Sequence, residues 1–289
     1  MAQSMNPIRN SEHGNEDTVS GTTGGPRPIS NGVKIYSWNV LFRNSELDRA
    51  FDFVSKSDFD IFCLQEVPEE FLKRLQALPC HIAYRSEREL LFRKGPLHNY
   101  IVILSKHPIE KEGEISFPDY WSLLPLRTKL FVYLMRPLHW SKIRNRNTLY
   151  VDIVAPEGPL RVFNLHTTLT RPDLRLREFE QAMTERDPSR PTIVCGDFNT
   201  IESLRMSVLN WFLGGRISDV LLYRRERTHI EKRFAEHELI NPLYGGITHP
   251  FSQSQLDHIL VSHSFSIQKA EILPDRIGSD HHPIRVEII

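Results

Sequence analysis

The sequence lacks the features that mark disulfide-rich secreted proteins and membrane-spanning proteins. Only three cysteines occur in 289 residues, Cys63, Cys80 and Cys195, and an odd number of this size does not make a disulfide framework. Cys63 and Cys195 lie inside apolar runs, which predicts buried free thiols in a reducing compartment. No stretch of about 18 apolar residues occurs, so no membrane-spanning helix is predicted. We therefore expect a cytoplasmic protein.

The sequence also lacks a net charge. It has 36 Lys and Arg residues against 36 Asp and Glu residues, so no overall field attracts a nucleic acid or a membrane, and any attraction for an anion must come from a local patch. The apolar fraction of 40% and the charged fraction of 25% are ordinary for a soluble globular protein.

The first 30 residues lack an apolar segment of the kind found in secretory signal peptides. They are rich in Gly, Ser, Asn, Thr and Pro, and such a segment buries too little apolar surface to order itself. We predict a disordered tail over residues 1–30. The composition does not change after residue 31, so residues 31–289 are predicted to form one domain.

Short apolar runs rich in β-branched and aromatic residues recur through this domain, and their lengths favour strands. These runs are Val33–Val40, Phe59–Gln65, Tyr100–Ser105, Leu130–Met135, Thr148–Val154, Leu160–His166, Pro191–Gly196, Leu256–Ser262 and Pro283–Ile289. Helical patterns lie between some of them, at Ser45–Ser57, Pro68–Leu78, Pro172–Arg186 and Ile201–Phe212. Many runs are apolar on both faces, which is typical of sheets covered on both sides. The pattern predicts a layered sandwich of the α/β or α+β class.

Polar residues stand at the ends of these predicted strands. Four strands deliver such groups near their C-terminal ends, at Asn39, Glu66, His166 and the pair Asp197 and Asn199. Two other strands carry them at their starts, at Asp257 and at Asp280–His281. If those two strands run antiparallel to the others, all eight residues meet at one edge of the sandwich. Each residue alone also suits a turn, a helix entry or a buried hydrogen bond; only the joint pattern indicates a site.

The chemistry of this set favours a divalent metal ion and a phosphate ester. Glu66, Asp280 and the amide oxygen of Asn39 are hard oxygen ligands of the kind that Mg²⁺ prefers, and the set contains no cysteine. A metal with Asp and His suits in-line attack of water on phosphorus. An Asp aligns or deprotonates the water, a His donates to the phosphoryl oxygens, and a second Asp fixes the tautomer of that His.

The order of these motifs resembles the endonuclease/exonuclease/phosphatase superfamily. The motifs are Asn39, Leu64-Gln65-Glu66, Asn164-Leu165-His166, Gly196-Asp197-Phe198-Asn199, Leu256-Asp257-His258 and Ser279-Asp280-His281. The resemblance runs from about residue 33 to the C-terminus, so residues 31–289 would be a catalytic domain of this superfamily. It implies an α+β fold, a four-layer αββα sandwich with two packed mixed β-sheets.

The resemblance also implies roles for individual residues. Asn39, Glu66 and Asp280 would belong to a Mg²⁺ site, with Mn²⁺ as an alternative. Asp197 would align the water, and Asn199 would donate to a phosphate oxygen. His281 would be the catalytic imidazole oriented by Asp257, and His166 would be a second histidine in contact with the phosphate.

A basic segment with interleaved aromatic residues offers a way to select the substrate. Trp121 to Tyr150 holds six basic residues and no acidic one, and its centre is predicted to be a loop between two strands. The candidate substrate-selecting residues are Arg136, Trp140, Lys142, Arg144 and Arg146. Such a loop binds a nucleic-acid backbone with Trp140 stacked on a base, or lies on an anionic membrane, or is an ordinary solvated hairpin.

These observations predict a metal-dependent hydrolase that cleaves a phosphodiester, with a nucleic acid as the favoured substrate. The alternatives are a phospholipid or sphingolipid phosphodiesterase, a small-molecule phosphatase of the same fold, and a non-catalytic module that binds nucleic acid or phospholipid. Peripheral contact with an anionic membrane fits the lipid alternative, and no obligate protein partner is inferred.

Overall fold

Two β-sheets form the centre of the fold. The structure, a computed structural model, describes residues 32–92, 95–135, 142–156, 158–222 and 225–289. Within these residues the first sheet has seven strands, in the order β12 (Ile267–Ile272), β13 (Ile284–Ile288), β1 (Val33–Asn39), β2 (Ile61–Pro68), β4 (Gly95–Ser105), β3 (His81–Phe92) and β6 (Lys142–Arg144). The second sheet has six, in the order β10 (Leu239–Ile240), β11 (Asp257–Ser262), β9 (Thr192–Asp197), β8 (Gly158–His166), β7 (Asn147–Ala155) and β5 (Ile109–Ser116).

The directions of the strands bring the polar strand ends to one edge. β1 runs parallel to β2, and β8 runs parallel to β9. β13 is antiparallel to β1, and β11 is antiparallel to β9, so the condition under which all eight polar residues meet at one edge holds. Asp257 at the start of β11 pairs directly with Asp197 at the end of β9. Both sheets are therefore mixed, as the sequence predicts.

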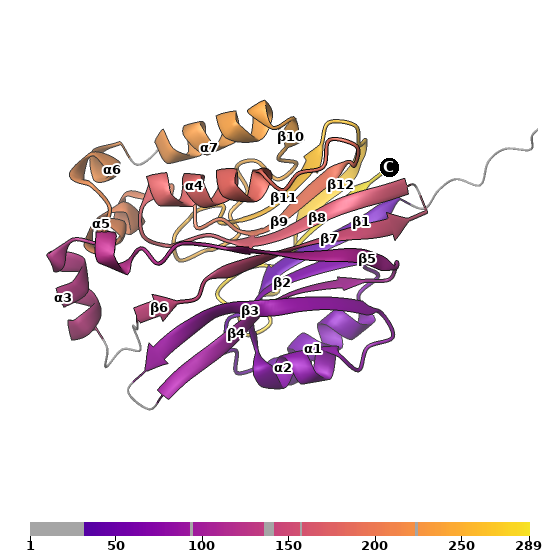
Figure 1. Ribbon diagram of the computed structural model, residues 1–289, viewed down its shortest axis with the longest axis horizontal. Helices are drawn as coiled ribbons and strands as arrows, with labels where there is room; N and C mark the ends of the chain where they lie inside the picture. Colours follow the sequence, from indigo (N-terminus) through magenta and orange to yellow (C-terminus); the bar gives the residue numbers. More distant parts are fainter. Residues whose placement is uncertain (1–31, 93–94, 136–141, 157, 223–224) are drawn as a thin grey trace, which may run out of the picture. The chain divides into compact units, whose positions relative to one another are not determined.

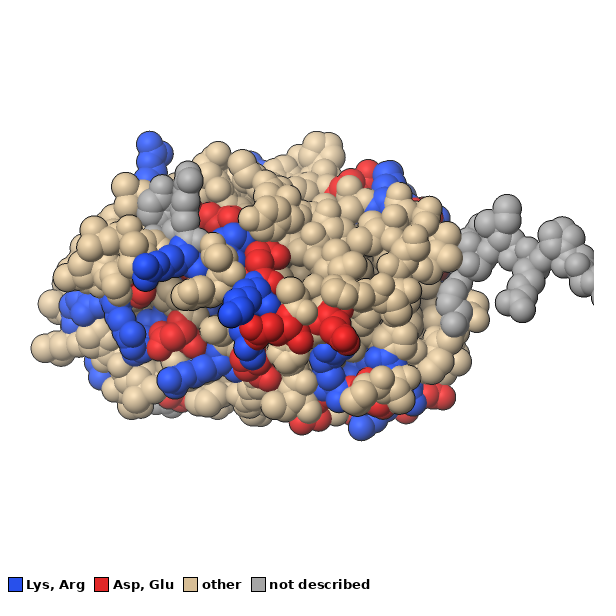
Figure 2. All heavy atoms as spheres, turned by 90° about the horizontal axis from the view of Figure 1, so that it is seen from above, with Lys and Arg blue, Asp and Glu red and all other residues tan. Residues whose placement is uncertain are grey.

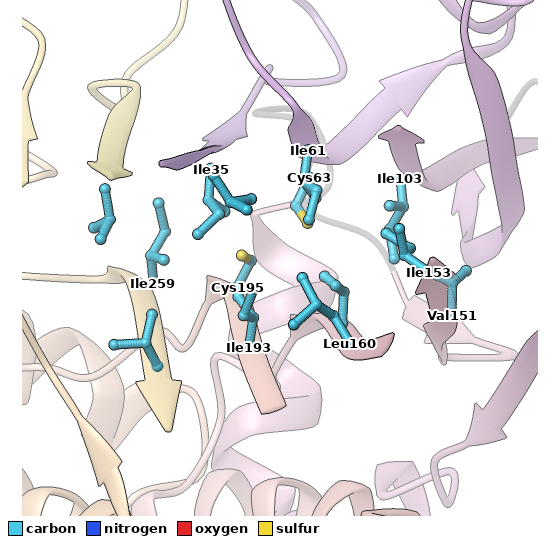
Figure 3. Close-up of a cluster of buried hydrophobic side chains, with 14 of the residues drawn as sticks. Ile35, Ile61, Cys63, Ile103, Val151, Ile153, Leu160, Ile193, Cys195 and Ile259 are labelled. Carbon is cyan, nitrogen blue, oxygen red and sulfur yellow. The ribbon is translucent and has the colours of Figure 1, made fainter. Parts of the chain in front are cut away.

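The central core lies between the two sheets and is mainly apolar, and Gln65 donates to Asn164 across it at 2.7 Å. Figure 3 shows Ile35 and Cys63 of the first sheet facing Leu160, Cys195 and Ile259 of the second. Cys63 and Cys195 are buried free thiols, as predicted. Burial, followed by a hydrogen bond with Cys195, raises the pKa of Cys63 well above its usual value. Both cysteines therefore act as small apolar side chains that join the sheets.

Helices cover the two outer faces, which completes the predicted four-layer αββα sandwich (Figure 1). α1 (Leu47–Lys56) and α2 (Glu69–Leu75) pack on the first sheet, and α4 (Pro172–Met183) and α7 (Arg225–Glu236) pack on the second. Figure 2 shows the face of the second helix layer, where both signs of charge are interspersed. Among the described residues, no helix has both the length and the apolar character to span a bilayer.

The helix α7 is rich in charged residues, but one side of it is buried. Residues 223–224 lie outside the described residues, and α7 begins at Arg225. Ile230 and Phe234 are buried against Phe179 and Leu260, and Arg227 is buried as well. Arg227, Ile230 and Phe234 recur at helical spacing and form one buried face. Most residues around them are charged, so the sequence shows no clear apolar pattern here.

The predicted strand Leu130–Met135 is wrong, because this segment belongs to α3 (Leu126–Leu134). Pro125 precedes the helix in an extended conformation, which is typical of a helix start. The run is apolar on all sides, so periodicity alone does not separate a strand from a helix. α3 is held by α5 (Leu204–Phe212), since the ring of Phe131 stacks on that of Phe212 with 5.4 Å between centroids.

The apolar runs in the sequence did not predict β3, β5 and β12, whose residues are in large part polar. β3 carries several charged residues, and β5 and β12 lie at sheet edges, where charged side chains discourage further strand pairing. β6 and β10 were missed because each has three residues or fewer. The other helical segments are η1 (Trp121–Leu123) and α6 (Ile217–Leu221). The apolar runs thus predict the central strands, while the edge strands carry too little apolar signal.

Gly196 is required where β9 lies against β8. Its φ is +137°, and a Cβ at this position would lie 1.8 Å from the carbonyl oxygen of Leu165. We expect Gly196→Ala to lower the free energy of unfolding by about 1–3 kcal/mol or more, because it combines backbone strain with a clash. Gly245→Ala is the matched control, since Gly245 also has a positive φ, of +80°, but nothing lies within 4 Å of its Cβ position. Equal losses for both variants in urea unfolding would show that the close approach to β8 has no effect.

Candidate active site

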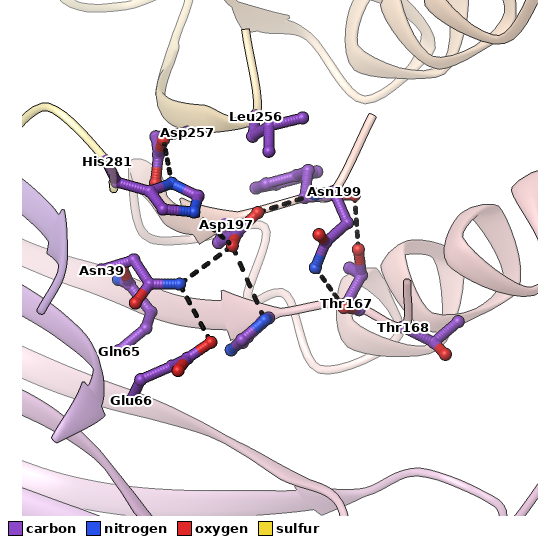
Figure 4. Close-up of polar contacts among 12 residues, drawn as sticks. Asn39, Gln65, Glu66, Thr167, Thr168, Asp197, Asn199, Leu256, Asp257 and His281 are labelled. Carbon is purple, nitrogen blue, oxygen red and sulfur yellow. Dashed lines mark hydrogen bonds and ion pairs between the residues drawn. The ribbon is translucent and has the colours of Figure 1, made fainter. Parts of the chain in front are cut away.

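The eight polar residues predicted from the strand ends lie at one edge of the sandwich (Figure 4). Asn39, His166 and Asp197 are the last residues of β1, β8 and β9. Glu66 lies in β2 where the pairing with β4 is irregular between Leu64 and Val67, and its φ is 56°. Such a bulge redirects a side chain, and here it points the carboxylate toward the second sheet.

Asn39 connects the two sheets. Its Nδ2 donates to Asp197 Oδ2 at 3.0 Å and to Glu66 Oε1 at 3.3 Å. Its Oδ1 accepts from the backbone N–H of Leu41 at 3.0 Å, which fixes the orientation of the amide. Asn39 is 2% exposed. The amide therefore holds the two carboxylates near each other without adding charge.

Asp257 and His281 form a buried pair next to Asp197. His281 Nδ1 lies 2.8 Å from Asp257 Oδ2, and its Nε2 lies 3.7 Å from Asp197 Oδ2. Burial lowers the pKa of His281, but the charges of Asp257, Asp197 and Asp280 and the hydrogen bond to Asp257 outweigh burial and raise this pKa to about 10. The ring is therefore an imidazolium at neutral pH, a hydrogen-bond donor with its Nε2 toward Asp197.

Asp280 lies on the outer side of His281. Its side chain is 48% exposed, and its Oδ2 lies 3.6 Å from Nε2 of His249. Burial of the carboxyl group would raise its pKa, but His249 and His281 lower it to about 2. His249, from the loop before β11, packs its ring 4.7 Å from that of His281. The sequence analysis missed His249 because no motif marks it.

His166 is held by a second carboxylate that the sequence analysis also missed. Its Nδ1 lies 2.8 Å from Oε1 of Glu87, and its Nε2 lies 3.6 Å from Oδ2 of Asp197. Burial lowers the pKa of His166, but the negative charge of Glu87 and the hydrogen bond to it raise this pKa overall. Glu87 also accepts the backbone N–H of Glu66 at 2.6 Å. One carboxylate therefore orients both the imidazole and the bulge that carries Glu66.

Arg88 is the third missed residue, and it contacts Glu66 directly. One terminal nitrogen of its guanidinium lies 2.7 Å from Glu66 Oε1, and its side chain is only 13% exposed. β3 is irregular between Ser86 and Arg88, so Glu87 and Arg88 both reach the site. A cation that binds Glu66 must share this carboxylate with Arg88 or displace it.

Asn199 lies just past the end of β9, with a φ of 51°. Its backbone N–H donates to Asp197 Oδ1 at 2.8 Å, and its Nδ2 donates to the carbonyl oxygen of Thr167 at 2.9 Å. An amide nitrogen carries two hydrogens, so one remains for a phosphate oxygen. Asn199 thereby orients Asp197 and keeps a donor beside it.

The carboxylate and imidazole groups at this edge fit a divalent cation. Two groups of three have ligand atoms within 4.8 Å of one another: His249, Asp280 and His281, and Asp197, Asp257 and His281. Among the described residues, Asp280 Oδ1 and Asp257 Oδ1 are buried oxygens without a hydrogen-bond partner. Of the predicted metal residues, Asn39 and Glu66 lie in contact, while Asp280 lies with the histidines on the other side of Asp197.

The predicted substrate-selecting residues are only partly within the described chain. Arg136 and Trp140 lie outside it, and the backbone of Lys142 and Arg144 forms β6 beside β3. Arg146 forms an ion pair with Glu178 and donates to the carbonyl oxygen of His166 at 2.8 Å. Its charge is thus already balanced, and its visible role is to support the end of β8.

The raised pKa of His281 predicts how stability depends on pH. The folded pKa of about 10 lies above the unfolded value of about 6.5, so the imidazolium stabilises the fold fully below about pH 6.5. This stabilisation is lost as the pH rises through about 10. In EDTA, the difference in free energy of unfolding between wild type and His281→Gln should therefore shrink from pH 6 to pH 10. A constant difference in urea unfolding across this range would contradict the raised pKa.

The chain belongs to the Endonuclease/Exonuclease/phosphatase family, whose model matches residues 36–281. Members of this family are divalent-metal-dependent phosphoesterases and nucleases. No curated protein sequence matches the chain.

Solved structures share the fold at low sequence identity. An endonuclease/exonuclease/phosphatase from Beutenbergia cavernae is 17% identical with a TM-score of 0.63, covering 89% of this chain and 71% of that one. The human Nocturnin catalytic domain with bound sulfate is 16% identical with a TM-score of 0.57, covering 90% and 94%. The Neisseria 3' phosphatase NExo bound to a product DNA hairpin is 15% identical with a TM-score of 0.56, covering 89% and 99%.

Proposed function

We propose that this protein hydrolyses a phosphodiester by in-line attack of water, with a divalent metal ion, Mg²⁺ or Mn²⁺, as its cofactor. The observation that carries the proposal is the convergence of Asn39, Glu66, Asp197, Asp257 and His281 on one edge of the sandwich, joined by the contacts of Asn39 and Asp197. A family whose members are phosphoesterases supports the same reaction.

The carboxylate of Glu66, next to Asn39, would hold the metal ion, which would neutralise phosphate charge and assist the leaving oxygen; Asp280 lies with His249 and His281 instead. Asp197 would align the water and accept its proton as the new P–O bond forms. Asn199 and Asn39 would hold Asp197 in position, each by one hydrogen bond to a different carboxylate oxygen. Fixing the base in this way lowers the cost of reaching the reactive geometry.

The two histidines would stabilise the charge that develops on the phosphoryl oxygens. His281 is an imidazolium held by Asp257, and His166 is held by Glu87. Each has its Nε2 directed toward Asp197, where the water would be bound. Donors placed before the reaction give the transition state more stabilisation than water does.

The sequence favours a nucleic acid as the substrate because of the basic segment with interleaved aromatic residues. The described part of that segment adds little to this preference. Arg136 and Trp140 lie outside the described residues, and Arg146 is paired with Glu178. A lipid phosphodiester is the second candidate, because exposed apolar side chains gather on the helices beside the site. A cytoplasmic location stays a prediction.

Hydrolysis of a substrate panel tests the proposed reaction. The panel contains plasmid DNA, single-stranded DNA, RNA, sphingomyelin, phosphatidylcholine and inositol phosphates, each with Mg²⁺, Mn²⁺ or EDTA. The protein is wild type or Asp197→Asn, which keeps the shape of the side chain and removes the base. We expect one class to be cleaved with metal only, and only by wild type. Cleavage that persists in EDTA or in Asp197→Asn would overturn the proposal.

A further inference from the structure

Exposed apolar side chains gather on four short helical segments, η1, α3, α5 and α6. Ten of the eighteen large apolar residues that are exposed in the described chain belong to these segments and an eleventh, Leu222, directly follows α6, so their clustering is not the ordinary scatter of apolar residues over a surface. They are Leu123, Leu126, Leu130, Tyr133, Leu134, Leu204, Val208, Phe212, Ile217, Leu221 and Leu222. We call this set the apolar end.

The helices of the apolar end are fastened to one another. Arg127 of α3 donates to the carbonyl oxygens of Trp211 and Gly215, which frame the end of α5. The rings of Phe131 and Phe212 stack, and α6 follows α5 after a turn through Gly214 and Gly215. Figure 1 shows α3, α5 and α6 at the same end of the sandwich. The exposed side chains thus form one surface on a packed base.

This surface carries cations and few carboxylates. Residues 121–135 and 203–222 contain four basic residues, Arg127, Lys129, Arg205 and Arg216, and one acidic residue, Asp219. The carboxylate of Asp219 already accepts the backbone N–H of Arg216. Lys129, Arg205 and Arg216 alternate with the exposed apolar residues. Apolar side chains ringed by Lys and Arg are typical of a surface that lies on anionic lipid, whereas the centre of a protein interface is depleted of charged residues.

A cavity lies between the apolar end and the segment that follows β8. It has a volume of about 110 Å³ and is lined by Trp121, Leu124, Val132 and Leu213 on the side of the helices. Its other wall is formed by Pro118, Asp119, Tyr120, Asn145, Arg146 and Thr168–Thr170, and Thr168 is the second residue after His166 at the end of β8. Figure 4 shows Thr167 next to Asn199, with Thr168 on the far side of Thr167.

We propose that the apolar end docks on an anionic phospholipid bilayer. The apolar residues would enter the lipid interface, while Lys129 and Arg205 would contact the head groups; Arg216 also pairs with Asp173, at 3.7 Å. Docking depends only on this surface, whereas use of a lipid as the substrate rests on the proposed function.

Sedimentation with vesicles tests the docking in EDTA, where no metal-dependent hydrolysis occurs. The full chain is mixed with phosphatidylcholine vesicles or with mixed phosphatidylcholine and phosphatidylserine vesicles. We expect binding to the mixed vesicles, weakened by salt, and a loss of at least about tenfold in the partition coefficient for Leu126→Glu/Leu221→Glu. Both leucines are exposed, at 80% and 74%, so the double variant should keep its fold.

Two further variants separate the effect of the apolar end on vesicle binding from effects of an added charge elsewhere and from loss of catalysis. Val154→Glu is the matched control, because Val154 is 40% exposed on β7 away from the apolar end and should leave binding unchanged. Asp197→Asn should lose catalysis and still bind vesicles as wild type does. Vesicle binding by this variant therefore distinguishes a failure of catalysis from a failure of docking. Equal binding by Leu126→Glu/Leu221→Glu and wild type would overturn the proposal. The proposal would also be overturned if wild type formed a dimer, did not bind vesicles, and became monomeric in the double variant. The apolar end would then be a protein interface.

Discussion

Replacing His281 with glutamine is expected to reduce kcat by about 10²- to 10⁴-fold on whichever phosphodiester the protein cleaves. Glutamine keeps a hydrogen-bond donor but loses the positive charge, which Asp257 holds in place at 2.8 Å. Because that charge would act on the oxygens that become more negative in the transition state, the loss should appear in kcat rather than in substrate binding. Steady-state kinetics in saturating metal measures it.

His282→Gln is the matched control for this prediction. His282 is the next residue, and its Nδ1 contacts the carbonyl oxygen of Leu273 rather than a carboxylate of the site. Its replacement should change kcat by less than about threefold. If both variants keep wild-type turnover, the imidazolium has no catalytic role. If His281→Gln loses turnover and still binds substrate, the alternative of a purely binding module is excluded.

The candidate site could be predicted because most of its residues stand at strand ends. Asn39, His166 and Asp197 each end an apolar run that is buried on both faces, a pattern typical of parallel strands. Parallel neighbours place their C-terminal ends together, so sequence position alone brings these groups to one edge. The register of β11 with β9 then places Asp257 opposite Asp197, which the sequence does not predict.

Glu87, Arg88 and His249 could not be predicted for the same physical reason. Glu87 and Arg88 lie in a strand of alternating charge, and only the irregular pairing of β3 with β4 turns both toward the site. His249 belongs to a loop whose single isolated bridge, to Ser254, brings it beside Asp280. Bulges and loop contacts depend on tertiary pairing, and no local pattern in the sequence marks them.

The helices at the apolar end show a different limit of sequence analysis. The run from Leu130 to Met135 is apolar on every side, so it fits a buried strand as well as a helix. In the structure the same residues form a helix of which Leu130, Tyr133 and Leu134 remain exposed. An apolar run that is neither buried nor amphipathic has no place in a self-contained core, and this points to a surface that is covered by another phase or molecule.

Glu66→Gln should weaken metal binding by at least about tenfold and abolish metal-dependent hydrolysis at metal concentrations that saturate wild type. The carboxylate of Glu66 is the charged oxygen donor beside Asn39, and glutamine offers only a neutral oxygen to a hard cation. Titration calorimetry with Mn²⁺ measures the affinity independently of turnover. Glu69→Gln is the control, since Glu69 is exposed on α2 and pairs with Lys73 at 2.8 Å.

Arg88→Gln should shift metal affinity in the opposite direction. The Arg88 guanidinium already occupies one oxygen of Glu66, and its charge repels a second cation at that carboxylate. Removing it leaves Glu66 and Glu87 without this partner, which should destabilise the metal-free protein by about 3–5 kcal/mol. Mn²⁺ should then bind more tightly and raise Tm more than it does in wild type, because the ion replaces the missing charge. A smaller Tm shift than in wild type would mean that Arg88 assists the metal instead of competing with it.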